Sequence, residues 1–220
     1  MVKLFKKGSA KSPEGESLKG RFSKIFDANI FGGVDSRSGG GSDMEQTALI
    51  RRVLPDLVKE LGIQTFVDAP CGDWHWMKSI DLGVEKYIGI DIVDSIIENN
   101  KREFGNSTTR FISLNLAEDP LPRADMIFCR DCLVHLTFAD IHNVIANFKK
   151  SGTKYLLTTT FAEREYNLDL ADAGGMWRTL NLELPPFNFP SPKQLINEQC
   201  TEVNGQFNDK SLGLWCLNDL

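Results

Sequence analysis

The chain has 220 residues, of which 41% are hydrophobic and 25% charged, and its formal net charge at pH 7 is -5. This composition fits one globular domain with a buried core, and it excludes collagen, coiled coil and low-complexity disorder. The longest apolar runs fall short of the roughly 20 residues of a membrane-spanning helix, and the first residues lack a signal peptide's apolar segment. We expect a cytoplasmic protein without membrane contact, and the acidic balance argues against a nucleic-acid partner.

Cysteine and histidine are too sparse to indicate a structural cross-link or a metal centre. The chain has five cysteines, an odd number, and three histidines. A disulfide framework needs an even set of cysteines, and structural zinc needs clustered cysteine and histidine ligands. We therefore expect reduced thiols and no metal site. The sequence leaves open whether the protein is a monomer or a homodimer.

The first 43 residues are predicted to lie outside the main domain. Lysines with interspersed Ser, Gly and Pro run to about Lys24, a pattern typical of a solvated basic arm. Residues 35–42 read DSRSGGGS and are predicted to form a flexible gating loop. From about Met44 to Leu61, apolar residues recur at helical spacing and Gly62 ends the pattern. The domain is expected to span residues 44–220.

An alternation of strands and helices follows. Five short apolar runs, bounded by turn residues, read TFVDA, KYIGIDI, TRFISLNL, ADMIFCR and KYLLTTTF. Helical periods occupy residues 94–104 and 138–150 between them. Buried runs that alternate with helices predict an α/β fold, a doubly wound Rossmann-like sheet of mostly parallel strands. Residues 162–192 are rich in Gly, Pro and aromatics and are predicted to be a lid insertion, and the C-terminus is predicted to form an antiparallel pair.

The carboxyl ends of the first two predicted strands carry the most informative residues. The first strand ends in Asp68 and is followed by Gly72, where the backbone must turn close to a ligand. The second strand ends in Asp91, about 20 residues later, at the spacing where a carboxylate can accept both hydroxyls of a ribose. Ligands of doubly wound sheets bind at these strand ends. Together the two acids indicate a cofactor that contains adenosine.

The motifs DAPCGDWHWM at residues 68–77, GIDI at 89–92 and RDCLVHL at 130–136 resemble those of the class I S-adenosylmethionine (SAM)-dependent methyltransferases. The combination is also similar to a subgroup of bacterial and viral methyltransferase-like proteins. The resemblance covers about residues 44–220 and implies a seven-stranded sheet with an antiparallel C-terminal strand. Pro70 and Trp74 stand where the family's first and third glycines fall.

The resemblance implies a role for each matching residue. Asp68 is expected to orient the methionine amino group of SAM, and Asp91 to bind the ribose hydroxyls. Ile92 is expected to pack against the adenine, and Arg130 to line the cofactor through its backbone. The expected cofactor-binding residues are Asp68, Ala69, Pro70, Cys71, Gly72, Asp91, Ile92, Asn115, Leu116 and Arg130. The product would be S-adenosylhomocysteine (SAH).

Asp131 and His135 are the candidate catalytic residues. They follow the fourth predicted strand and, at i and i+4, would share one face of a helical turn. A hydroxyl acceptor needs a base, for which His135 is the natural candidate, with Asp131 as its orienting partner or as the base itself. The alternative for His135 is a histidine packed against the sheet.

The sequence thus predicts a SAM-dependent methyltransferase that methylates a hydroxyl of a small molecule or a glycan. The candidate acceptor-binding residues are Trp76, Trp177, Arg178, Asn181 and Phe187. Two alternatives stay open: an NAD-dependent oxidoreductase and a non-catalytic SAM-binding module. An amine acceptor, which needs no strong base, also stays open.

Overall fold

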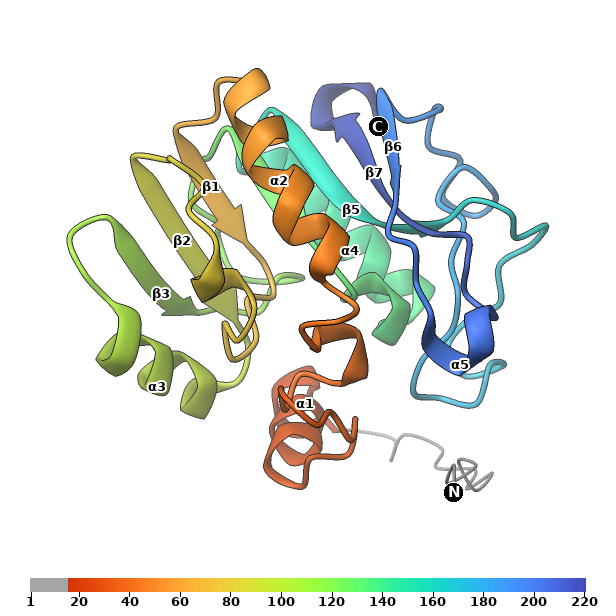
Figure 1. Cartoon of the computed structure of the whole chain (residues 1–220). Coiled ribbons are helices and arrows are strands. Elements are labelled where there is room, and N and C mark those ends of the chain that lie inside the picture. Colours follow the sequence, from red (N-terminus) through yellow and green to blue (C-terminus); the bar gives the residue numbers. More distant parts are fainter. Residues whose placement is uncertain (1–15) are drawn as a thin grey trace.

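A seven-stranded sheet, with strand order β3-β2-β1-β4-β5-β7-β6, forms the centre of the molecule (Figure 1). The computed structural model describes residues 16–220. The strands are β1 (Thr65–Asp68), β2 (Lys86–Asp91), β3 (Thr109–Ser113), β4 (Met126–Cys129), β5 (Tyr155–Phe161), β6 (Gln194–Asn197) and β7 (Lys210–Cys216). The first five are parallel, and β7 runs antiparallel to both β5 and β6. The predicted α/β fold is confirmed, including the antiparallel C-terminal strand.

Helices cover both faces of this sheet. The longer ones are α1 (Leu18–Asp27), α2 (Ala48–Glu60), α3 (Asp94–Phe104) and α4 (Phe138–Lys150); α5 (Glu202–Gly205) is a single turn. Short 3-10 turns are η1 (Gly40–Ser42), η2 (Met77–Ser79), η3 (Leu133–His135) and η4 (Leu217–Asp219). Helices α3 and α4 match the predicted ranges. Helix α2 begins at Ala48 instead of Met44, because the preceding residues form turns.

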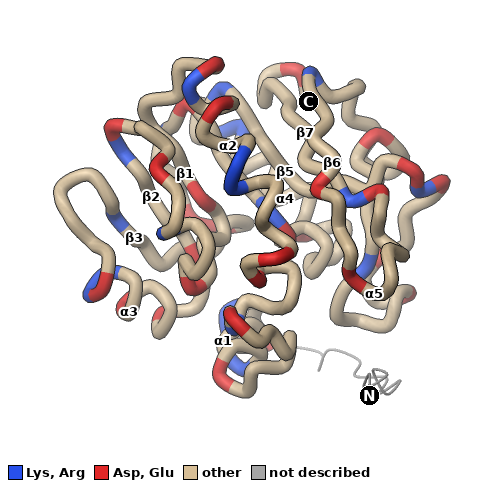
Figure 2. Tube along the Cα trace, viewed as in Figure 1, with Lys and Arg blue, Asp and Glu red and all other residues tan. Residues whose placement is uncertain are grey.

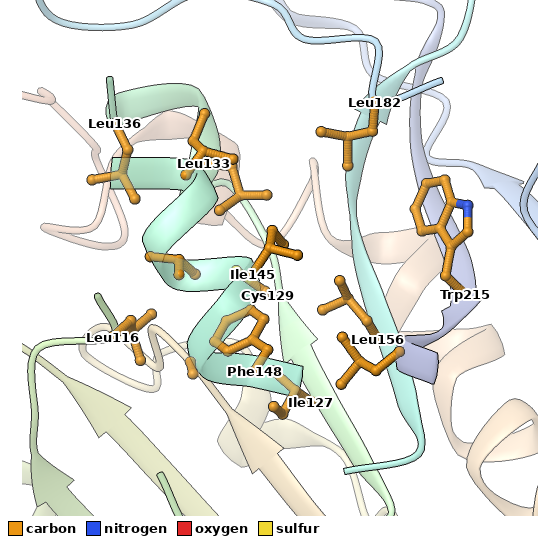
Figure 3. Packing of buried hydrophobic residues seen from close by; sticks show 14 of the residues in the cluster. Leu116, Ile127, Cys129, Leu133, Leu136, Ile145, Phe148, Leu156, Leu182 and Trp215 are labelled. Carbon is orange, nitrogen blue, oxygen red and sulfur yellow. The ribbon is translucent and has the colours of Figure 1, made fainter. Parts of the chain in front are cut away.

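The alternation of side chains along the strands builds two cores. Phe66 of β1 packs in the cluster that contains α2 and α3 residues, while its neighbour Val67 packs in the cluster that contains α4. Figure 3 shows Ile145 and Phe148 of α4 against Ile127 and Leu156 of the sheet. Burial on both faces explains why the central strands read as continuous apolar runs.

The N-terminal region differs from the prediction. Residues 18–27, expected to belong partly to a solvated arm, form α1, with the Ser17 side chain accepting a hydrogen bond from the Gly20 amide (3.1 Å). Leu18, Phe22 and Ile25 pack on the core or are buried. Their helical spacing was the sequence signal for this helix. The arm expected before Glu16 lies outside the described residues.

Helix α1 bridges the edge of the sheet at which the parallel strands end (Figure 1). The Lys19 ammonium contacts the Asp94 carboxylate at the start of α3 (2.8 Å). The Arg21 guanidinium donates to the carbonyl of His135 in η3 (2.7 Å). The helix is therefore fastened on both sides of the switch point between β1 and β4, where the strand order reverses.

Charge does not single out a face of the molecule. In Figure 2, basic and acidic residues are interspersed along the described chain. None of the described helices is long and apolar enough to cross a membrane. The functional site must therefore be found from local geometry.

We predict that Phe148→Ala destabilises the protein by about 3–5 kcal/mol, because it leaves a cavity between α4 and the sheet. Chemical denaturation followed by circular dichroism measures this loss. The control is Leu168→Ala, whose side chain is 44% exposed and whose effect should stay within about 0.5 kcal/mol. Equal losses for the two variants would contradict the assigned packing.

Candidate functional site

A cleft lies at the carboxyl ends of β1, β2 and β4, and α1 forms its roof. It encloses about 1170 Å³, including the part that opens to solvent. The predicted residues that line it are Asp68, Pro70, Cys71, Gly72, Trp76, Asp91, Ile92, Asn115, Leu116, Arg130, Asp131 and His135. The structure thus brings together residues from four separate segments of the sequence. Ala69 does not line the cleft; it is fully buried, and its amide donates to the Phe128 carbonyl (2.8 Å).

Asp68, at the tip of β1, is buried and receives a hydrogen bond from the Tyr87 hydroxyl of β2. Burial disfavours the charged carboxylate and raises its pKa to about 7. The Tyr87 hydrogen bond and the more distant Arg130 charge act in the opposite direction, while Asp91 adds to the rise. The carboxyl is therefore poised between its neutral and charged forms near neutral pH.

Asp91, at the tip of β2, is held by two backbone amides. The Gly72 amide donates to one carboxylate oxygen (3.1 Å) and the Val93 amide to the other (3.0 Å). Burial raises the pKa of Asp91 to about 6, although both hydrogen bonds favour the charged form. The carboxylate therefore links the turn after β1 to the start of α3 through these two hydrogen bonds.

Gly72 is required by the geometry of that turn. Its φ of +52° lies in the left-handed region, and a Cβ would fall 2.4 Å from the Ser38 hydroxyl. Asp73 binds residues 36–38 to this turn, because its carboxylate accepts hydrogen bonds from the Ser36 hydroxyl (2.8 Å) and the Arg37 amide (3.0 Å). The loop predicted to be a gate is thus hydrogen-bonded to the turn after β1. Asp73 was not among the predicted site residues.

Asn115 and Leu116 line the cleft beyond β3. The Asn115 side-chain oxygen accepts from the Ala117 backbone amide (3.0 Å), and the Asn115 backbone amide donates to the Asp119 carboxylate (2.7 Å). These bonds hold the turn in place, and the side-chain nitrogen Nδ2 of Asn115 has no hydrogen-bond partner among the described residues. Leu116 is buried in the α4 core cluster and supplies an apolar wall.

The tip of β4 carries a buried network of charges. The Arg130 guanidinium binds the Glu198 carboxylate with two nitrogens (2.8 and 3.3 Å), and Lys210 binds Asp131 (2.6 Å). Arg130 also lies 3.2 Å from Asp131 and 5.9 Å from the Trp76 ring centre. Arg130 was expected to contribute its backbone, but its side chain organises this end of the cleft. Glu198 and Lys210 escaped prediction because they come from the C-terminal hairpin.

This network makes Asp131 unsuitable as the general base. Burial alone would raise its pKa, but Lys210 and Arg130 outweigh burial and hold the pKa of Asp131 well below its usual range. A carboxylate held this firmly in its charged form accepts protons poorly. The interpretation of Asp131 as a base is therefore corrected: it is an ion-paired wall of the cleft.

His135 is oriented by the backbone instead of by Asp131. Its Nδ1 lies 2.8 Å from the Met176 carbonyl oxygen. Because a carbonyl only accepts, Nδ1 carries the proton and Nε2 is left unprotonated in the neutral ring. Burial lowers the pKa of His135 to about 4, so the ring is neutral at pH 7. The Phe31 ring lies 4.7 Å from the imidazole centre.

Two residues of the predicted lid point away from the cleft. The Trp177 ring packs edge-on against Phe161 (5.9 Å) and Phe207 (4.9 Å). Phe187 packs against Phe138 (5.3 Å). Neither lines the cleft, so the prediction that they face the acceptor is corrected.

The other two predicted lid residues hold irregular backbone in place. Arg178 donates to the carbonyls of Leu133 (2.8 Å) and Leu168 (3.2 Å). The Asn181 amide donates to the Arg164 carbonyl (3.0 Å). Backbone carbonyls outside regular structure need such partners when they are buried. Of the five residues predicted to bind acceptor, Trp76 lines the cleft.

The roof and one wall were not predicted. The roof consists of apolar side chains from residues 18–31: Leu18, Phe22, Ile25, Phe26 and Phe31. His75 lines the wall, and its Nε2 is buried and has no hydrogen-bond partner within residues 16–220. The helical spacing of the roof residues indicates a helix, but no local pattern indicates that this helix lies over the cleft. Among the described residues, no cluster of His, Cys, Asp and Glu suits a metal ion.

Comparison with known proteins gives similarity in structure but not in sequence. No protein-family model matches the chain, and no curated protein matches its sequence. The N-methyltransferase NodS from Bradyrhizobium japonicum, in complex with SAH, superposes with a TM-score of 0.66 at 11% identity, covering 88% of this chain and 97% of that chain.

Two further solved structures support the same architecture. The 1,6-didemethyltoxoflavin-N1-methyltransferase of Burkholderia thailandensis, with bound SAH, gives a TM-score of 0.61 at 13% identity and covers 91% of both chains. The magnesium protoporphyrin IX methyltransferase of Synechocystis, with bound SAM, gives 0.58 at 15% identity, covering 91% of this chain and 97% of that chain. The chain therefore has the Rossmann-like fold of class I SAM-dependent methyltransferases.

Proposed function

We propose that this protein is a SAM-dependent methyltransferase that methylates a hydroxyl group of a small acceptor. The observation that carries the proposal is the pair of buried carboxylates at the tips of β1 and β2, with the Gly72 turn between them. The three similar structures are methyltransferases with bound SAM or SAH. Their identities to this chain are low, so the proposal depends on the residues of the cleft.

The residues present fit SAM. Each Asp91 oxygen accepts one backbone amide, which leaves a lone pair on each for a ribose hydroxyl. Asp68 forms no ion pair with any of the described residues, although it is buried beside the cleft. An ammonium group such as that of the methionine moiety would supply the missing charge. A Cβ at Gly72 would disturb the turn between the two acids.

The chain's own contribution to the reaction is alignment and proton removal. SAM supplies an activated methyl group when it is bound. The acceptor hydroxyl must lie in line with it. His135 lines the cleft, and its unprotonated nitrogen is Nε2, because Nδ1 is engaged by the Met176 carbonyl. The ring is neutral throughout the physiological pH range, so Nε2 keeps a lone pair for the acceptor hydroxyl, while burial, which lowers the pKa of His135 to about 4, makes it a weaker base than an exposed histidine.

The roof favours a flat, largely apolar acceptor over a glycan. The glycan expectation depended on Arg178 and Asn181, which lie outside the cleft. The aromatic side chains of Phe26 and Phe31 instead line it. Aromatic side chains stack well on planar rings, so we propose a small ring-containing alcohol such as a phenol.

We predict that Asp91→Ala lowers the affinity for SAH by at least about 100-fold, because two hydrogen bonds to a charged group contribute about 1.5–3 kcal/mol each. Isothermal titration calorimetry with SAH, SAM and NAD⁺ measures this effect. The control is Glu98→Ala, an exposed carboxylate of α3 outside the cleft. Binding of NAD⁺ alone would support the oxidoreductase alternative and overturn the proposal.

We predict that His135→Asn lowers kcat at least 100-fold on a phenolic acceptor, in line with the loss of a general base. Asparagine keeps a donor for the Met176 carbonyl and removes Nε2. SAH affinity should change less than about twofold, since His135 is assigned to the acceptor. Transfer of labelled methyl from SAM to a panel of phenols measures kcat. His142→Asn, outside the cleft, is the matched control.

Two outcomes would redirect the assignment. Full activity of His135→Asn would remove His135 as the base and favour an amine acceptor, which loses its proton to water. SAH binding without transfer to phenols, amines or glycans would favour the non-catalytic binding module.

A further inference from the structure

The hydroxyl of Tyr87 reaches Asp68 because of the register of β1 and β2. Tyr87 is paired with Phe66 in the parallel ladder, and the two rings stack with centres 5.9 Å apart. Asp68 follows Phe66 by two residues and so points to the same face of the sheet. The tyrosine side chain therefore leans along this face and ends at the Asp68 carboxylate.

The Tyr87 ring cannot swing away from this position. It is 6% exposed and packs between Phe66, Trp74 (5.5 Å) and Phe111 (6.1 Å). Its hydroxyl donates to one oxygen of Asp68. The second oxygen accepts no hydrogen bond from the described residues, and Asp68 lines the cleft. One side of the carboxylate is thus fixed and the other is free for a ligand.

The charged and titratable groups around Asp68 come from every neighbouring segment. Strand β2 contributes Tyr87 and Asp91, and the turn after β1 contributes Cys71. Cys129 is the last residue of β4, and Arg130 follows it directly. The thiols are neutral, since burial raises the pKa of Cys71, and the hydrogen bond with Cys132 together with burial raises that of Cys129, well above the usual value. Arg130 is already paired with Glu198. Tyr87 is therefore the one hydrogen-bond donor among the described groups that acts on the charged form of Asp68.

We propose that Tyr87 is a positioning residue that stabilises the charged form of Asp68 for the ammonium group of the cofactor and so sets the pH range of cofactor binding. This inference rests on the proposed function. Cofactor binding requires the carboxylate, so affinity rises with pH as Asp68 loses its proton. Near pH 7, binding is coupled to release of that proton.

Whether Tyr87 raises or lowers the pKa of Asp68 depends on which protonation state of Asp68 its hydrogen bond stabilises. A donor to a carboxylate stabilises the charged form, so the Tyr87 hydrogen bond lowers the pKa of Asp68 against the larger effect of burial. Removing the hydroxyl raises the pKa further above about 7. The midpoint of the affinity curve must then move to higher pH.

The test is calorimetric titration of the full chain with SAH from pH 5.5 to 8.5, for the wild type and Tyr87→Phe. We expect the midpoint of the variant to lie roughly one pH unit higher, so that at pH 7 its affinity is about fivefold lower. The gap should close toward pH 8.5. Buffers of different ionisation enthalpy give the protons released at pH 7, expected to rise from about 0.5 to about 0.9.

Two further variants make the result decisive. Tyr166→Phe removes an exposed hydroxyl and should leave the curve unchanged. Asp68→Asn should bind more weakly and release no proton from this site. Asp91 also titrates, but equally in the wild type and Tyr87→Phe, so their difference reports Asp68. Circular dichroism verifies that each variant is folded.

Different results would overturn the role of Tyr87 and the proposed function. An affinity loss for Tyr87→Phe that is equal at every pH, with an unchanged proton count, would mean that Tyr87 is only structural and would overturn the inference. The proposed function would then still stand. Absence of SAH binding to the wild type at every pH would overturn both.

Discussion

Two acidic side chains buried at the ends of adjacent strands are the constraint on which this site depends. A carboxylate without water must be neutralised by protons, by hydrogen-bond donors or by a counter-charge. Asp91 meets this requirement with the Gly72 and Val93 amides. Among the described residues, Asp68 has the Tyr87 hydroxyl as its hydrogen-bond donor. The turn after β1 and the start of α3 therefore adopt conformations that place hydrogen-bond donors at a buried carboxylate.

On the opposite wall of the cleft, buried carboxylates are neutralised by cationic side chains. Asp131 and Glu198 are paired with Arg130 and Lys210. Two of these four residues belong to the C-terminal hairpin, which packs antiparallel beside β5. Removing one partner of such a buried network leaves an uncompensated charge, which costs several kcal/mol. The last strand thus completes the site as well as the sheet.

Much of the fold could be predicted because its signals are local. The bounds of α3 and α4 follow from apolar periodicity, and the positions of Asp68 and Asp91 follow from strand ends. The acceptor side could not be predicted, because Trp177, Arg178, Asn181 and Phe187 are consistent with a pocket or with a packed loop. Only tertiary contacts decide between these alternatives. The ion pair between Asp131 and Lys210 joins residues 79 positions apart, which no local pattern indicates.

The two walls divide the cleft into regions of different charge. At the β4 end, the acids are balanced by cations, so a ligand there needs no charge, in keeping with the apolar roof and the neutral His135 ring. At the β1 and β2 ends, burial raises the pKa of both acids, and neither acid forms an ion pair with any of the described residues. A ligand that brings positive charge would relieve this cost at the β1 and β2 ends. Under the proposed function, a molecule that is cationic at one end would bind with that end at these acids and its reactive group directed toward His135.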